Sequence, residues 1–169
     1  MKRDELREAQ RPLKQRYRDE PETARLTLRA DGELGAEAVS CSVETGRAIV
    51  EAGLHPASGG DGMLACSGDM LLQALVACAG VTLRSVAVNR GLEVSGRVVA
   101  EGDLDFRGTM GVDGDAPVGL TAIRVRFELD SEASEEELDA LLEATERFCV
   151  VYQTLAGGVP LEVRRSAGR

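Results

Sequence analysis

The sequence predicts an α+β fold in which antiparallel strands surround one buried helix. Residues Met70 to Val81 are apolar or small except for Gln73, so a helix formed here is apolar on nearly every side. Residues 120–130 alternate between apolar and polar side chains, the pattern of a strand with one buried face. Antiparallel sheets wrapped around the helix, or two such helices packed across a dimer interface, would cover the apolar surface.

Six segments are predicted to form strands. Short turns, DGELG and TG, separate the first three. In the second of them, Cys41 shares the apolar face with Val39 and Val43, so we interpret it as a small buried residue. The six segments are residues 24–30, 37–44, 47–53, 92–106, 120–130 and 159–164.

Two helices are expected within the folded domain. The apolar helix begins at Ser67, which suits the N-cap position, and Asp69 lies in its first turn, where a negative charge is favoured. A second helix begins at Ser134, has glutamates at its N-terminus and ends near Cys149.

Residues 1–23 are predicted to form a basic helical arm, and residues 24–169 a single domain. The arm has apolar side chains at helical spacing, although Pro12 should kink or divide its helix. Its first 18 residues hold seven basic and three acidic side chains, which leaves a charge of about −13 for the rest of the chain. We expect the arm to lie against the acidic helix 134–147 across a dimer.

The composition disfavours several kinds of partner. A net charge of −9 argues against nucleic-acid binding, which depends on clustered Lys and Arg. The longest uncharged helical run, Met70 to Leu83, is shorter than the about 20 residues that span a bilayer, so no membrane association is expected. The N-terminus has no apolar leader, which predicts a cytoplasmic protein whose thiols stay reduced.

Cysteine is the residue type best placed to carry chemistry. The one histidine, His55, is interpreted as an ordinary loop residue, and cysteine intervals of 25, 12 and 71 residues do not fit a metal site. P-loop, dinucleotide and G-x-S-x-G motifs are missing, so we expect neither a metal nor another cofactor. Taken alone, Cys78 in the apolar helix is interpreted as core filling, because burial raises the pKa of a thiol. Reactivity would require a cation such as arginine, or the end of another helix, beside its sulfur.

Two segments resemble the OsmC/Ohr family of osmotically inducible and organic hydroperoxide resistance proteins. They are CSGDMLLQALVACAGVTLRSVA, which follows a glycine-rich loop, and ERFCVVYQTL near the C-terminus. The order of strands and helices is similar too, and the likeness extends over about residues 24–164. The resemblance implies an OsmC/Ohr-like fold with antiparallel sheets around a central cysteine-bearing helix, an intertwined homodimer, and thiol-dependent reduction of organic hydroperoxides without a cofactor.

The resemblance also implies which residues act. Cys78 would be the peroxidatic thiol and Cys149 the resolving thiol. Asp69 corresponds to the acid that pairs with an activating arginine, and Arg47 is the first candidate for that arginine, ahead of Arg29. The implied partners are a small apolar hydroperoxide and a dithiol reductant, for which a lipoyl-type dithiol is one candidate.

Departures from the family pattern leave alternatives open. Asp69 lies nine residues before Cys78, which is about 13 Å along a straight helix, so it is equally well interpreted as a helix cap. Val150 stands where family members commonly have proline, and Cys66 is a second candidate for the resolving thiol. The rival functions are a binding or redox-sensing dimer that holds an apolar ligand, and a fold in which all four cysteines are structural.

Overall fold

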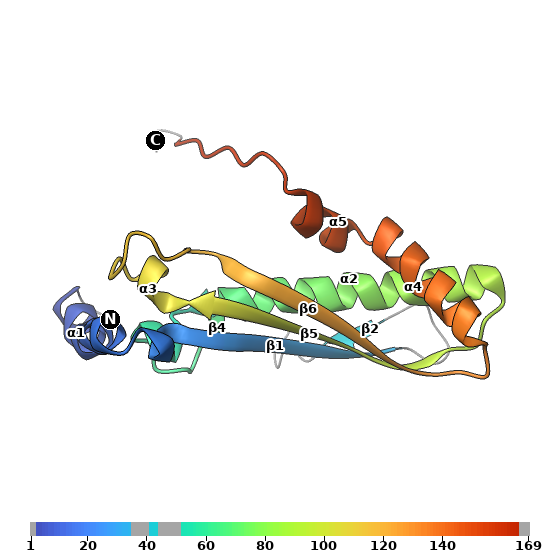
Figure 1. The fold of residues 1–169 in the computed structure, drawn as a ribbon, viewed down its shortest axis with the longest axis horizontal. Helices are drawn as coiled ribbons and strands as arrows, with labels where there is room; N and C mark the ends of the chain where they lie inside the picture. The colour runs from blue at the N-terminus through green and yellow to red at the C-terminus, as the bar shows by residue number, and fades with distance from the viewer. Residues whose placement is uncertain (1–2, 35–40, 44–51, 166–169) are drawn as a thin grey trace, which may run out of the picture.

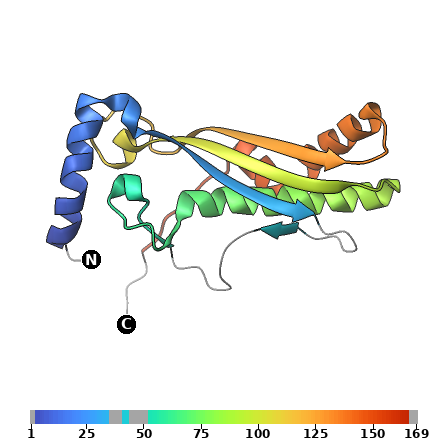
Figure 2. The same ribbon diagram turned by 90° about the horizontal axis from the view of Figure 1, so that it is seen from below.

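The computed structural model describes residues 3–34, 41–43 and 52–165. Within these ranges the chain is elongated and is built on a four-stranded antiparallel sheet, with the helix α2 lying along one face (Figures 1 and 2). The predicted α+β class is therefore confirmed.

The four strands follow the order β2-β1-β5-β6, and every neighbouring pair is antiparallel. In the central strand β5, Ala100 pairs with Ala30 of β1 on one side and with Val125 of β6 on the other. β6 is an edge strand among the described residues, and its outer backbone edge pairs with no strand there. The bounds are β1 Arg25–Leu34, β2 Cys41–Val43, β5 Ser95–Asp105 and β6 Leu120–Asp130.

The predicted strands agree with this sheet to different extents. The segments 92–106 and 120–130 are confirmed as β5 and β6, and 24–30 is confirmed within the longer β1. The described part of the second predicted strand is β2, which includes Cys41, and its remaining residues lie outside the described ranges. Residues 47–51 of the third lie outside the described residues, and its last two residues form a small parallel pair of strands, β3 Ala52–Gly53 and β4 Ala65–Cys66.

The predicted apolar helix is α2 (Ser67–Arg90). Its N-cap residue is Cys66 rather than the predicted Ser67, and it ends at Gly91, whose φ of 70° is the left-handed conformation that glycine adopts most readily. Leu72, Leu75, Val76 and Ala79 of α2 form the main core with Val98, Ala100 and Cys149.

One face of α2 is left uncovered by the part of the chain that the structure describes. Leu71 is 39% exposed, Val81 40% and Val88 54%. The described sheet and C-terminal helices thus do not bury the helix on nearly every side, and cover by a second copy, the other predicted arrangement, stays a prediction. The positions on this face repeat every three or four residues, as in a helix-packing seam: Leu71, Ala74, Cys78, Val81, Ser85 and Val88.

Among the described residues, α2 is also the one helix whose length and composition would allow it to cross a membrane. Its most apolar window has a mean hydropathy of 1.8, and 44% of that window is buried inside the fold. The prediction considered only the uncharged run Met70 to Leu83, which is too short to span a bilayer. The whole helix α2 has 24 residues and is longer than that run. The buried core helix of a soluble protein has the same length and composition. The same helix α2 carries a charged residue, Arg84, which donates a hydrogen bond to the Val94 carbonyl at 2.9 Å.

Two helices follow β6. The predicted acidic helix is α4 (Glu135–Phe148), which starts with a capping box between Ser134 and Glu137. Cys149 ends α4 and is at the same time the N-cap of a second helix, α5 (Val150–Gly157). Helix α5 was not predicted, because eight mostly apolar residues are too few to show a helical period clearly.

The basic arm is a continuous helix, α1 (Arg3–Asp19), with Pro12 inside it. The expected division at Pro12 does not occur. Tyr17 is fully buried, and its hydroxyl donates a hydrogen bond to the Ala57 carbonyl at 2.6 Å. The side chains around it come from α1 itself, from β1, β5 and the segment after α3, and from three short elements: η1 Pro21–Ala24, η2 Pro56–Ser58 and α3 Phe106–Thr109. The arm and α4 lie at opposite ends of the molecule (Figure 2), so the expected contact between them is possible only between two copies.

The segment 159–164 was predicted to be a closing strand, and this prediction is wrong for the single chain. Residues 158–165 have no regular secondary structure and extend away from the body of the molecule beyond α5 (Figure 1). Val159, Leu161 and Val163 are 52%, 89% and 96% exposed. A strand needs a neighbouring strand for its backbone hydrogen bonds, and α5 directs this segment away from the sheet of its own chain.

Candidate thiol site

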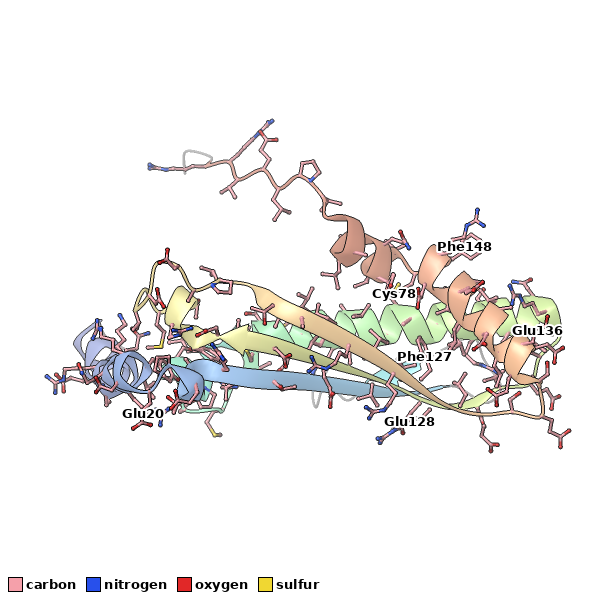
Figure 3. The ribbon with its side chains drawn as sticks, viewed as in Figure 1. Glu20, Cys78, Phe127, Glu128, Glu136 and Phe148 are labelled. Atoms are coloured by element: carbon pink, nitrogen blue, oxygen red, sulfur yellow. The ribbon has the colours of Figure 1, made fainter. Side chains whose placement is uncertain are left out.

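The two predicted thiols lie next to each other. Cys78 is in the middle of α2, and Cys149 is at the junction of α4 and α5, which packs against α2. Both are free thiols, and they lie close enough that each shifts the pKa of the other. Figure 3 shows Cys78 between α2 and the α4–α5 junction, with Phe148 pointing outward. Residues 71 positions apart in the sequence are thus brought together as predicted.

Four polar groups oppose the effect of burial on the Cys78 thiol. They are the backbone N–H groups of Val151 and Val150 at the start of α5, the thiol of Cys149, and the hydroxyl of Thr82, one helical turn further along α2. Burial is the largest single influence and raises the pKa of Cys78, but these hydrogen bonds together outweigh it. The pKa of Cys78 is therefore lower than that of an ordinary cysteine, which favours the reactive thiolate.

The pKa of Cys149 is shifted in the opposite direction to that of Cys78. Its side chain is completely buried, and burial raises its pKa. Negative charge on Cys78 raises the pKa of Cys149 further, while the N–H of Tyr152, which donates to its Sγ at 3.5 Å, acts in the opposite direction. The pair therefore favours a thiolate on Cys78 and a protonated thiol on Cys149, the arrangement that a nucleophile and its resolving partner need.

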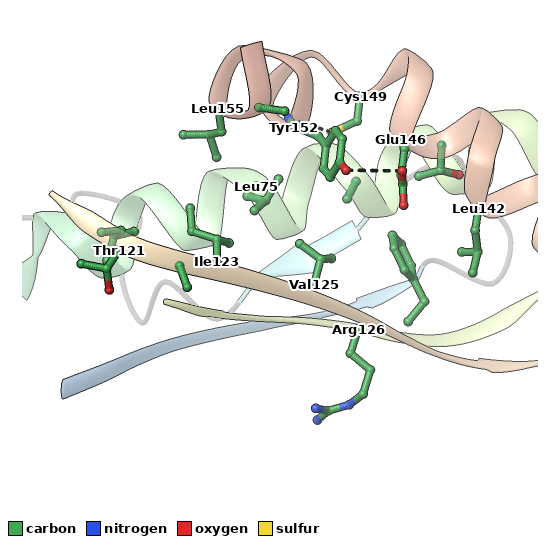
Figure 4. Close-up of a pocket in the computed structure, with 16 residues that line it drawn as sticks. Leu75, Thr121, Ile123, Val125, Arg126, Leu142, Glu146, Cys149, Tyr152 and Leu155 are labelled. Carbon is green, nitrogen blue, oxygen red and sulfur yellow. Dashed lines mark hydrogen bonds between the residues drawn. The ribbon is translucent and has the colours of Figure 1, made fainter. Parts of the chain in front are cut away.

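An apolar cavity of about 680 Å³ lies beside Cys149, between β6 and the helices α2, α4 and α5 (Figure 4). Most of its walls are aliphatic, including Leu75, Ile123, Val125 and Leu155. Its volume is in the range of small-ligand pockets, and its lining suits an alkyl or aryl group.

Two polar residues of the cavity were not predicted. The hydroxyl of Tyr152 donates a hydrogen bond to Oε2 of Glu146 at 3.3 Å, and this bond joins α4 to α5 across the cavity wall (Figure 4). The charge of Glu146 is the main cause that raises the pKa of Tyr152. No local motif marks these residues. A prediction that α5 begins at Val150 would have placed Tyr152 in the first turn of that helix, next to its N-cap Cys149.

The structure does not place the other predicted site residues beside Cys78, as far as it describes them. Burial raises the pKa of Asp69, and the charged neighbour that opposes this shift is His55. His55 accepts a hydrogen bond from Ala57 N–H at 3.0 Å and stacks on Phe106, which agrees with its interpretation as a loop residue. Arg47 lies outside the described residues. Arg29 pairs with Glu101 in the sheet, and its side chain is not described.

The second candidate for the resolving thiol, Cys66, lies at the N-cap of α2 and is half-buried. Cys66 is not among the groups that shift the pKa of Cys78, whereas Cys149 is. The structure thus pairs Cys78 with Cys149.

Comparisons with known proteins agree with the family resemblance. The family described as OsmC-like protein matches residues 60–164, more than half of the chain. A crystal structure of an OsmC-like hydroperoxide resistance protein from Jannaschia sp. CCS1 has a similar fold, with a TM-score of 0.54 and 17% sequence identity over 86% of this chain and 95% of that one. No curated protein matched the chain.

Proposed function

Because the chain belongs to the OsmC-like protein family, we propose that it reduces organic hydroperoxides through the thiols of Cys78 and Cys149. The observation that carries this proposal is the contact between the two thiols together with the opposite directions of their pKa shifts. The solved relative, described as a hydroperoxide resistance protein, supports a peroxide-related role.

The proposed reaction has two thiol steps. The Cys78 thiolate attacks one oxygen of the hydroperoxide, so that an S–O bond forms, the O–O bond breaks and the departing alkoxide takes up a proton as an alcohol. Cys149 then attacks the sulfur of the Cys78 sulfenic acid, which forms a disulfide and releases water. A dithiol reduces this disulfide by exchange and returns both cysteines to thiols.

The cavity beside Cys149 supports an apolar substrate. Its mostly aliphatic walls would hold the organic group of a small hydroperoxide such as cumene hydroperoxide beside Cys149. The reaction needs no metal or other cofactor, and a cytoplasmic location, which keeps thiols reduced, belongs to the same proposal.

A stoichiometric titration tests the proposal. One equivalent of cumene hydroperoxide added to the fully reduced protein is expected to remove two thiols per chain, and peptide mapping should identify a disulfide between Cys78 and Cys149. A dithiol should then sustain continuous consumption of the peroxide. If all four thiols are retained after an excess of peroxide, the proposal is wrong, and a retained apolar ligand in native mass spectrometry would favour a binding protein.

The uncovered face of α2 supports the proposal that the protein works as a homodimer. Leu71, Val81 and Val88 of this face are large exposed apolar residues on one side of a long helix, and Cys78 is half-buried in the same row. Packing the face against the same face of a second copy would bury these side chains and complete the surroundings of the thiol.

The C-terminal segment supports the same dimer. Val159, Leu161 and Val163 occupy alternate positions, and Glu162 and Arg164, which form an ion pair of 2.7 Å, stand between and after them, which is the pattern of a strand with one apolar side. A second copy offers a place for this strand at the free edge of β6, next to the apolar cavity. The segment of one copy would then pair with β6 of the other and form the outer wall of its cavity.

Leu161→Asp tests this exchange. The charge would lie on the buried side of the exchanged strand, so we expect the dimer to dissociate at least ~10-fold more readily, as measured by sedimentation velocity over a range of concentrations. Glu162→Ala is the matched control, because this residue lies on the opposite side and should leave the dimer intact. Equal dissociation of the Leu161→Asp variant and the unmodified protein would contradict the exchange.

A further inference from the structure

We infer that the cavity beside Cys149 selects uncharged organic ligands over anionic ones, and that Glu146 is the residue that makes this selection. The inference rests on the proposed function and narrows its substrate class to neutral organic hydroperoxides, as opposed to those that carry a carboxylate. Tyr152 is a positioning residue, which fixes the Glu146 carboxylate at the cavity wall.

The carboxylate of Glu146 has a defined place in the cavity wall. It accepts a hydrogen bond from the Tyr152 hydroxyl at 3.3 Å, and the backbone carbonyl of Glu146 accepts another from Nε2 of Gln153 at 2.8 Å. The two bonds join the last turn of α4 to α5, and Figure 4 shows the carboxylate directed from α4 toward β6. Glu146 is solvent-exposed at this edge, and the bonds keep its negative charge beside the cavity.

The charge of Glu146 is close to the thiol. Glu146 precedes Cys149 by three residues, which is about one helical turn. The N–H of Tyr152 donates to Sγ of Cys149 at 3.5 Å, so Tyr152 contacts the thiol through its backbone and the carboxylate through its hydroxyl. A ligand that occupies the cavity beside Cys149 would therefore lie close to the Glu146 carboxylate.

No cation among the described residues that line the cavity offsets this charge. The one basic residue of the lining is Arg126, which forms an ion pair of 3.0 Å with Glu128. Arg126 lies between Val125 and Phe127 in β6, and because successive side chains of a strand point to opposite faces, its guanidinium points away from the cavity (Figure 4). The other lining residues are apolar or uncharged apart from Glu146.

Two effects therefore act against an anionic ligand. A carboxylate loses hydration in an apolar cavity whatever residue stands at position 146, and this cost is not offset by a counter-ion. Repulsion by the Glu146 carboxylate adds to it, because two like charges a few ångströms apart repel strongly where protein replaces part of the water between them. A neutral hydroperoxide meets neither effect.

The experiment compares two ligands of nearly equal shape, para-isopropylbenzamide and para-isopropylbenzoate, of which only the benzoate is charged at neutral pH. Titration of the reduced protein, followed by methyl NMR, gives both dissociation constants, and shifts of the Ile123, Val125 and Leu155 signals place the ligand in the cavity. The benzoate is expected to bind at least ~10-fold more weakly than the benzamide. Glu146→Gln, which keeps the size of the side chain, should reduce this ratio about fivefold.

Two further variants separate the place of the charge from its sign. Glu136→Gln removes the same charge from the other end of α4, about 15 Å away along the helix, and should leave the ratio unchanged. Tyr152→Phe keeps the ring but no longer holds the carboxylate at the cavity, so the ratio should fall part of the way toward that of Glu146→Gln.

Four results would overturn the inference: equal binding of the two ligands to the unmodified protein, an unchanged ratio in Glu146→Gln, equal changes in Glu146→Gln and Glu136→Gln, or no shift of the cavity methyl signals with either ligand. Binding needs no thiol chemistry, so its outcome is independent of turnover. Selective binding of the benzamide by a protein that does not consume cumene hydroperoxide would uphold the selectivity of the cavity and refute the proposed function.

Discussion

Replacing Cys78 by serine is expected to reduce hydroperoxide consumption to the rate of the solution without protein. A serine hydroxyl stays protonated at neutral pH, so no nucleophile attacks the O–O bond. Consumption of cumene hydroperoxide in the presence of excess dithiol measures the effect. Undiminished consumption by Cys78→Ser would remove Cys78 from the mechanism.

Cys149→Ser is the informative companion to this variant. It keeps the nucleophile but removes the resolving thiol, so one equivalent of peroxide should be consumed rapidly before the disulfide step fails. The Cys78 sulfenic acid should then accumulate and react with dimedone, which mass spectrometry detects. Because Cys149 also lowers the pKa of Cys78, the first attack should itself become somewhat slower.

The second large effect is expected from Tyr17→Ala, which should lower the free energy of unfolding by about 3–5 kcal/mol. Tyr17 is fully buried and joins the helix α1 to the region around Phe106 and Met110, so its removal leaves a cavity at this end of the molecule. Urea denaturation followed by circular dichroism measures the change. A loss below about 1 kcal/mol would show that α1 is dispensable for the stability of the domain.

Tyr17→Phe serves as the control for packing. It keeps the ring and removes the hydrogen bond from the hydroxyl to Ala57, which should cost about 1 kcal/mol. The contrast between the two variants assigns the role of Tyr17 to its ring. It also bears on the organisation of the chain, since a residue of the predicted arm is part of a core cluster.

The helices and the long strands could be predicted from the sequence because their signals are local. Alternation along β6 and the capping box at Ser134 both act within a few residues, and each predicted element is found where these signals lie. Helix α5 is too short for such a signal. The segment 159–164 has the pattern of a strand, yet whether it forms one depends on a partner strand that its own chain does not place beside it.

The candidate site shows the same division. The sequence by itself identified Cys78 as a thiol in an apolar helix, which needs a cation or the end of another helix to be reactive. The pairing with Cys149 followed only from the family resemblance. The tertiary structure brought a second thiol to Cys78, because Cys149 at the junction of α4 and α5 approaches it only when these helices pack against α2. Hydrogen bonds between residues far apart in the chain depend on this packing, and no local pattern encodes them.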